Sequence, residues 1–199
     1  MGGIWGACLS LPACHVAGMN HIAALPLHSM PAWLEGELRS DHAGETGAVM
    51  IYRGILAVSR DAAAREFAQR HMVTEQGHLR LIEQVLPAAK HSRLLPIWRV
   101  AGWLTGAIPA LFGPRAIFAT IDAVESFVDH HYQQQIDRLD AEQSFPALRA
   151  MLAQCQEEEV HHRDEARGLG VAPPSLALLG WCWMVGAGSK AAVMAAKRI

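Results

Sequence analysis

The fold is indicated most directly by two short stretches, Glu75-Gln-Gly-His78 and the acidic run Glu157-Glu-Glu-Val-His-His162. Each contains a glutamate followed three positions later by a histidine, and residues three apart share one face of a helix. A carboxylate and an imidazole can then reach one metal ion together. Each motif also follows an earlier helical glutamate, Glu45 before the first and Glu125 before the second. The unit therefore occurs twice, once in each of two helical hairpins.

This repeat matches the ligand set of di-iron helix bundles, in which two helices each supply a Glu and two others each supply a Glu-x-x-His. A single Glu-x-x-His would indicate little, because Glu and His are common on solvated helix faces. Two copies, each preceded by a helical glutamate, are much harder to obtain by chance. Four carboxylates and two imidazoles suit two iron or manganese ions with open coordination positions. The spacing therefore predicts a buried pair of metal ions.

The neighbours of the first motif predict that it points inward. A stripe with helical offsets of three and four contains Ala68, His71, Glu75, His78, Ile82 and Val85. The second motif offers two registers. Glu159 with His162 lies on the cleaner apolar stripe, formed by Leu152, Cys155, Ala166 and Leu169. Glu158 with His161 lies on a more polar stripe, with Met151 and Gln154. Spacing alone leaves both registers open.

The remaining pattern is helical, with almost no alternating strand signal. Amphipathic helices are predicted over residues 31–60, 61–86, 97–141 and 144–168, and an apolar helix over 175–197. Gly113-Pro114 predicts a kink or break within the third helix. The predicted fold class is all-α: a ferritin-like four-helix bundle with an apolar extension of helix 3 and an appended apolar C-terminal helix.

Composition narrows the function classes. The chain has 199 residues, 51% of them hydrophobic, which suits one domain with a substantial core. Its formal charge of −2 provides no basic field for nucleic acid. None of its 4 cysteines forms a C-x-x-C pair, so thiolate zinc sites and a disulfide framework are not expected and a reducing compartment is. The first basic residue is Arg39, so a secretory or transit signal is not expected either.

Two apolar stretches, 94–112 and 176–196, raise the question of a membrane. Each approaches the roughly 20 residues of a spanning helix, but Pro96, Arg99 and Pro109 interrupt the first and Lys190 the second. Tryptophans concentrate in them, and Trp prefers the headgroup level of a bilayer. We expect both stretches to lie in the interface rather than to span. Packing against each other or against a second copy is the competing interpretation.

Longer stretches resemble the demethoxyubiquinone hydroxylase family. Leu38–Ala48 followed by Ile51-Tyr52 is similar to the first helix of these proteins. Pro96–Gly102 and Ala123–Tyr132 resemble their third helix, and Glu157–His162 resembles the fourth. The resemblance covers about residues 34–199. The short link Gly168–Pro174 departs from it, because acidic residues of many relatives are missing there.

The resemblance implies a di-iron monooxygenase that hydroxylates a polyprenyl 6-methoxy-1,4-benzoquinol in ubiquinone biosynthesis, using molecular oxygen and NADH-derived electrons. Its motifs carry over the metal ligands Glu45, Glu75, His78, Glu125, Glu158 and His161. On helix 4 it therefore favours the more polar register. His131 and Tyr132 match a His-Tyr pair that relays electrons or protons; an ordinary supporting hydrogen bond is the alternative role. Asp41 and His42 are expected to surround the ligands.

On this interpretation residues 1–28 are a poorly specified leader and 29–199 the di-iron hydroxylase domain. The enzyme is expected to be peripheral, on the cytoplasmic face of a bacterial inner membrane. Expected partners are the benzoquinol, the membrane surface, and a second copy or a protein that presents the quinone. Competing functions are a ferritin-like protein for iron storage or peroxide scavenging and a metal-free structural or lipid-binding protein. The two apolar stretches weigh against the ferritin-like protein.

Overall fold

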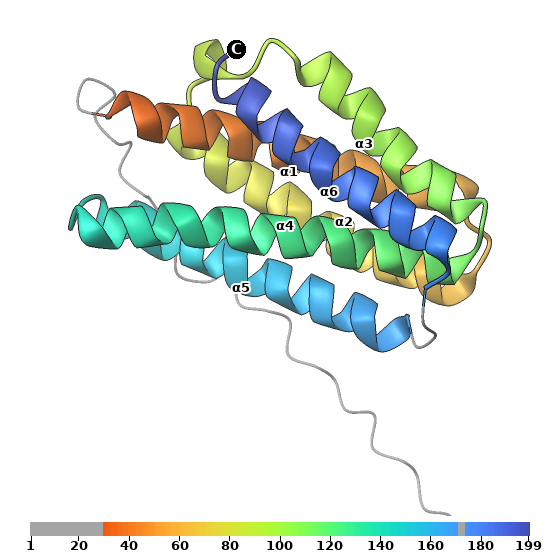
Figure 1. Ribbon diagram of the computed structural model, residues 1–199. Coiled ribbons are helices and arrows are strands. Elements are labelled where there is room, and N and C mark those ends of the chain that lie inside the picture. Colours follow the sequence, from red (N-terminus) through yellow and green to blue (C-terminus); the bar gives the residue numbers. More distant parts are fainter. Residues whose placement is uncertain (1–29, 171–173) are drawn as a thin grey trace, which may run out of the picture.

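The computed structural model describes residues 30–170 and 174–199, and all regular structure in these ranges is helical (Figure 1). Four long helices form the bundle: α1 (Ala32–Val58), α2 (Ala62–Val85), α4 (Pro114–Ala141) and α5 (Pro146–Leu169). Outside it lie α3 (Leu95–Ala110), α6 (Leu176–Ala196) and the short 3-10 helix η2 (Ala88–Lys90). The predicted all-α, ferritin-like bundle with an apolar C-terminal helix is confirmed. The predicted leader, 1–28, lies outside the described residues.

The ends of the helices follow local chemistry. Asp61 caps α2 by accepting a hydrogen bond from the backbone nitrogen of Ala64 at 2.9 Å, and Ser175 caps α6 in the same way. Gly113 has a φ of 93°, a conformation that favours glycine, and Pro114 then starts a new helix. The chain therefore breaks here completely. The apolar extension predicted for helix 3 is a separate helix, α3, which turns back to pack along α1 (Figure 1).

Glycines bring the backbones of α1 and α3 into direct contact. A Cβ atom on Gly106 would overlap the carbonyl oxygen of Ile51, and one on Gly54 would overlap that of Trp103. Gly102 meets the backbone of Gly47 in the same way. Larger side chains would push the helices apart. These contacts fix α3 against the bundle.

Helix α6 packs along α4 and α1 and is tied to the bundle near both ends. Near its start, the indole nitrogen of Trp181 donates to Thr120 Oγ1 at 2.8 Å. Just after its end, Lys197 Nζ lies 2.6 Å from a Glu37 carboxylate oxygen. The backbone nitrogen of Arg93 also donates to the Ile199 carbonyl at 2.9 Å. This helix therefore lies alongside the bundle over its whole length (Figure 1).

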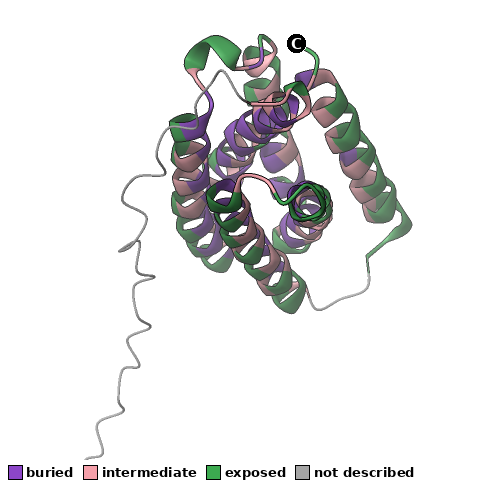
Figure 2. Ribbon diagram, turned by 90° about the vertical axis from the view of Figure 1, so that its left-hand side faces the viewer, coloured by how far each residue is buried: buried purple, intermediate pink, exposed green. Residues whose placement is uncertain are grey.

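Two apolar clusters fill the bundle, and a polar segment separates them. The inward faces of the bundle helices are buried, and α2 and α5 expose their outward faces, whereas α3 and α6 cover much of the outer side of α1 (Figure 2). One cluster includes Tyr52, Phe67, Ile121 and Ala166; the other includes Leu38, Ile82, Ile136 and Leu152. Each set contains one residue from each of α1, α2, α4 and α5. Between the two sets, every bundle helix carries buried acidic or histidine side chains.

Candidate metal centre

Buried carboxylates and imidazoles from all four bundle helices meet in this polar segment. One group whose ligand atoms lie within 4.8 Å of one another consists of Glu45, Glu75, His78 and Glu159. A second such group consists of Glu75, Glu125, Glu159 and His162. Glu75 and Glu159 belong to both groups. The arrangement therefore offers two adjacent cation positions that share two carboxylates.

The predicted two-fold repeat organises these six residues. Helices α1 and α2 supply Glu45, Glu75 and His78, and helices α4 and α5 supply Glu125, Glu159 and His162. His78 Nδ1 lies 2.9 Å from Glu159 Oε1, and His162 Nδ1 lies 3.0 Å from Glu75 Oε1. Each histidine thus reaches the glutamate of the opposite hairpin.

The structure brings the other register of α5 into the cluster than the one assigned from the resemblance. Glu159 and His162 point inward, whereas His161 is 73% exposed and Glu158 lies at the edge of the cluster. Successive residues of a helix are rotated by about 100°, so only one of the two registers can face the core. The buried face of α5 carries Leu152, Cys155 and Ala166, as the apolar stripe indicated. The other predicted ligands, Glu45, Glu75, His78 and Glu125, do come together.

Two tyrosines hold the outer glutamates. Tyr132 Oη donates to Glu45 Oε1 at 2.5 Å, and Tyr52 Oη donates to Glu125 Oε1 at 3.3 Å. Each tyrosine lies two helical turns after the glutamate of its own helix and contacts the glutamate of the other half. This role of Tyr52 was not predicted from the sequence. The same spacing from glutamate to tyrosine in α1 and α4 was the signal that could have found it.

His131 lies beside the cluster in a polar network with α1. Its Nε2 is 3.1 Å from both Asp41 Oδ1 and Ser40 Oγ. Asp41 also accepts a hydrogen bond from Gln135 Nε2 at 2.8 Å. His42 turns away from this network and stacks on the ring of His91. Asp41 therefore supports the neighbourhood of Tyr132, but His42 does not.

The pKa values of the cluster residues are shifted because several carboxylates are buried close together. Burial raises the pKa of Glu45 to about 8, and burial with the nearby Glu159 and Glu75 raises the pKa of Glu125 well above its usual range. Burial lowers the pKa of His162, but hydrogen bonds with Glu159 and Glu75 outweigh this and raise it to about 11. Protons thus balance the negative charge when no cation is bound. A metal ion would displace these protons, since its ligands must be deprotonated.

The donor set fits cations of the iron type. Several buried atoms aimed at the cluster lie near other polar groups but make no hydrogen bond of good geometry among the described residues, namely Glu45 Oε2, both oxygens of Glu75, and His78 Nδ1. Leaving buried carboxylates unpaired costs several kcal/mol each, on the order of the penalty for burying a lone charge. Mixed carboxylate and imidazole ligands suit non-haem iron or manganese. The cluster therefore has both the chemistry and the unmet bonding capacity of a two-metal site.

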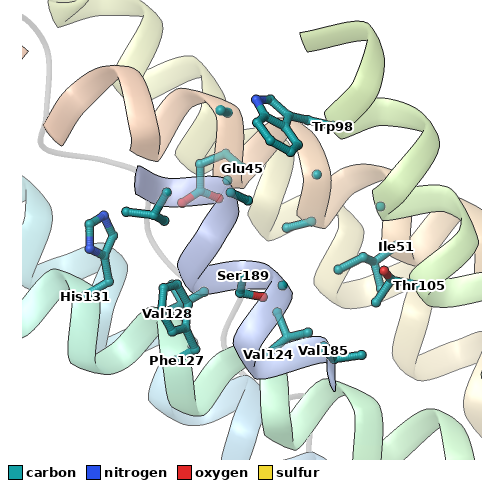
Figure 3. A pocket seen from close by; sticks show the side chains of 18 of the residues that line it. Glu45, Ile51, Trp98, Thr105, Val124, Phe127, Val128, His131, Val185 and Ser189 are labelled. Atoms are coloured by element: carbon teal, nitrogen blue, oxygen red, sulfur yellow. The ribbon is translucent and has the colours of Figure 1, made fainter. Parts of the chain in front are cut away.

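An apolar pocket of about 310 Å³ ends on this cluster. Its inner end reaches Glu45, Glu75, Glu125 and Glu159, and its walls come from α1, α3, α4 and α6. Figure 3 shows Glu45 at the inner end, with Trp98 of α3, His131 of α4 and Ser189 of α6 around the space. Small residues such as Gly102 and Gly188 line it without filling it. A flat, apolar molecule could reach the carboxylates from between α3 and α6.

Comparison with known proteins identifies the family of the chain. The family model described as "Ubiquinone biosynthesis protein COQ7" matches residues 32–196. A 3-demethoxyubiquinol 3-hydroxylase from Rhodospirillum rubrum is 38% identical over 86% of this chain and 81% of its own length. A mitochondrial NADPH-dependent 3-demethoxyubiquinone 3-hydroxylase from Caenorhabditis elegans is 32% identical over 86% of this chain and 93% of its own. The match spans every described helix, and the chain belongs to the COQ7 family of ubiquinone biosynthesis proteins.

Proposed function

We propose that this chain is a di-iron monooxygenase that hydroxylates a polyprenyl 6-methoxy-1,4-benzoquinol during ubiquinone biosynthesis. The observation that carries the proposal is the apolar pocket that opens onto the carboxylate–histidine cluster. The names of its relatives, 3-demethoxyubiquinol and 3-demethoxyubiquinone 3-hydroxylases, supply the substrate class. An iron-storage protein would need no apolar pocket at its metal site, so the pocket favours a hydroxylase.

Six side chains would hold the iron pair: Glu45, Glu75, His78, Glu125, Glu159 and His162. Glu75 and Glu159 lie in both four-residue groups and would be within reach of both ions. The iron ions would supply the activation of molecular oxygen. The protein would supply their geometry, through Tyr132 and Tyr52 on the outer glutamates, and a site from which most water is excluded.

The pocket walls would orient the quinol ring. His131 lines the pocket, and Asp41 and Ser40 hold its imidazole through Nε2. Tyr132 touches both the pocket and Glu45. We infer that His131 positions a ring oxygen and that Tyr132 passes a proton to or from Glu45. This keeps the relay role that the resemblance implied for the pair.

The apolar rim of the pocket would dock on a membrane. By length and composition α6 could cross a bilayer, yet it lies along the bundle and forms a pocket wall. Apolar side chains on α3 and α6 are exposed, among them Ile97, Val100, Trp183 and Met184, and Met184 also lines the pocket. Neither helix contains an acidic residue, whereas Arg99 and Lys190 are exposed on them. Such a face suits insertion into an anionic leaflet, with the prenyl tail left in lipid.

The direct test is turnover by the purified, iron-reconstituted chain. A prenylated 6-methoxybenzoquinol, isotopically labelled O2 and either NADH or NADPH with an electron carrier would be supplied. We expect one labelled oxygen atom in the ring of the product by mass spectrometry. Both reductants belong in the test, since the resemblance implies NADH and the worm relative is named for NADPH.

The matched variants are Glu75→Gln, inside the cluster, and Glu157→Gln, on the exposed face of α5. Product should disappear with Glu75→Gln and persist with Glu157→Gln. Absence of labelled product from iron-loaded, reduced wild-type protein would refute the proposed function. Accumulation of many iron ions per chain without quinol turnover would instead support an iron-storage protein.

A further inference from the structure

The two metal positions of the proposed centre differ, because a carboxylate stands directly behind only one of the two histidines. His78 Nε2 lies 2.7 Å from Glu158 Oε2, on the side of the ring away from the cluster. The other ring nitrogen, Nδ1, faces Glu159 Oε1 at 2.9 Å. The His78 ring is thus held at both nitrogens, with the outer one bonded to an ionisable group that is not in either metal group.

The histidine of the other half has a different environment. His162 also presents Nδ1 to the cluster, toward Glu75 and Glu159. Its ring, however, packs edge-on against the ring of His71 with centroids 4.1 Å apart. Among the described residues no carboxylate hydrogen-bonds to Nε2 of His162.

The sequence explains this asymmetry. The residue before the shared glutamate of α5 is Glu158, whereas the residue before the shared glutamate of α2 is Thr74. A threonine carries no charge to place behind a histidine. The two-fold repeat is therefore broken at this position. Glu158 belongs to neither metal group and instead contacts His78 from outside the cluster.

We propose that Glu158 is a positioning residue that gives the metal position beside His78 the higher affinity of the two. This proposal rests on the proposed two-metal function. By accepting a hydrogen bond from Nε2–H, Glu158 keeps the proton of His78 on Nε2 and the lone pair on Nδ1, where a metal ion would bind. Its negative charge also makes the imidazole a stronger donor. Gln154 Nε2 donates to Glu158 Oε1 at 3.3 Å and holds the carboxylate in place.

Glu158 can be changed without opening a cavity in the core, because its side chain is 37% exposed. The test is anaerobic calorimetric titration of the metal-free protein with Fe²⁺, and with Co²⁺ as an air-stable probe. Wild-type protein should bind two ions with distinct affinities. Glu158→Ala should weaken the tighter one by about tenfold to a hundredfold, the usual effect of removing such a partner. The weaker ion should change by less than about threefold.

Two further variants separate charge from shape. Glu158→Gln keeps an oxygen that can accept from Nε2–H but removes the charge, so its effect should be intermediate. Glu157→Gln removes the same charge one position away on the exposed face and should leave both ions unchanged. In a His78→Ala background, which removes the tighter ion, Glu158→Ala should have no further effect on the remaining one.

The second ion acts as an internal control for folding. Equal weakening of both ions, or no weakening of either, would overturn the role of Glu158 while leaving the two-metal function standing. Wild-type protein that binds no Fe²⁺ at all would overturn both proposals together.

Discussion

Each of the four glutamates in the centre is held by a side chain from the opposite half of the bundle. Tyr132 holds Glu45 and Tyr52 holds Glu125, while His162 contacts Glu75 and His78 contacts Glu159. Such crossed contacts tie the two helical hairpins together at the point where buried charge is greatest. Removing one partner of a buried hydrogen bond leaves the other unsatisfied, which costs roughly 1–3 kcal/mol.

The Tyr132→Phe variant tests these contacts. Losing the hydroxyl leaves Glu45 Oε1 buried without its 2.5 Å donor. We expect the free energy of unfolding of the metal-free protein at neutral pH to fall by about 1–3 kcal/mol in urea titrations. Tyr52→Phe is the matched control and should cost less, because its contact with Glu125 is longer at 3.3 Å. A larger loss for Tyr52→Phe would contradict this ranking.

His71 gives the metal-free protein a sensitivity to acid. Burial, with the nearby charge of His162, lowers the pKa of His71 to about 4, below the ordinary value of 6.5. The unfolded chain therefore takes up a proton that the folded chain does not, so stability falls as the pH drops from about 6.5 toward 4. The full loss from this residue is up to about 3 kcal/mol.

The His71→Gln variant removes this titration. Its unfolding free energy should fall less than that of the wild type between pH 6.5 and 4, although it is lower at neutral pH because the contact with Glu165 is weakened. Parallel pH dependences for the two proteins would show that His71 does not titrate as described.

At the scale of the helices, the contact between α1 and α3 sets the shape of the pocket. Gly54, Gly102 and Gly106 allow the two backbones to touch, so α3 forms a fixed wall. Helix α6 forms the opposite wall and carries glycines that meet nothing within 4 Å, such as Gly186. The two walls are therefore held in place differently. Close backbone packing holds α3, whereas side-chain hydrogen bonds near its two ends hold α6.

Gly106→Ala should disrupt the fixed wall. The added methyl group would overlap the Ile51 carbonyl, and overpacking of this kind costs about 1–3 kcal/mol. We expect a lower thermal midpoint by circular dichroism and reduced quinol turnover. Gly186→Ala, in open space on α6, should instead be neutral or stabilising by up to about 1 kcal/mol, through helix propensity alone. Equal effects of the two substitutions would argue against close packing at Gly106.

The periodicity of apolar residues predicted the bundle helices well. It did not predict how α3 packs against the bundle. The stripe through Ala68, His71 and Glu75 is buried throughout, because polar and apolar positions on α2 separate cleanly. On α5 the apolar stripe indicated Glu159 and His162, and these are the residues on the buried face, whereas the motif match favoured Glu158 and His161. The separate placement of α3 could not be read from the sequence, since an apolar segment after a loop shows no preferred direction. Backbone contact through glycine requires coordinates.

On the scale of the whole molecule, polar and apolar surfaces are divided between the bundle and its two added helices. The exposed face of α5 carries ion pairs such as Arg167–Asp122, whereas α3 and α6 expose Trp103, Trp183 and Met184. Large exposed apolar areas around a pocket mark a binding surface rather than an ordinary solvated one. This division gives the molecule one face suited to lipid.

Trp183→Glu tests the membrane face. Trp183 is 76% exposed on α6, and a charge there opposes insertion into the headgroup region. We expect binding to vesicles containing anionic lipid to weaken by about tenfold or more in sedimentation assays, which corresponds to roughly 1.4 kcal/mol. Val73→Glu, on the bundle helix α2 and 62% exposed, is the matched control and should bind as the wild type does. Equal binding by both variants would place the lipid contact elsewhere.

The proposed function requires that two metal ions share the buried carboxylates at the middle of the bundle. The most direct measurement is an anomalous difference map at the iron edge, from crystals of the protein reconstituted with Fe²⁺ under anaerobic conditions. We predict two adjacent peaks, both beside Glu75 and Glu159, with His78 next to one and His162 next to the other. No peak in the bundle, or iron bound at His161 on the surface of α5, would contradict it.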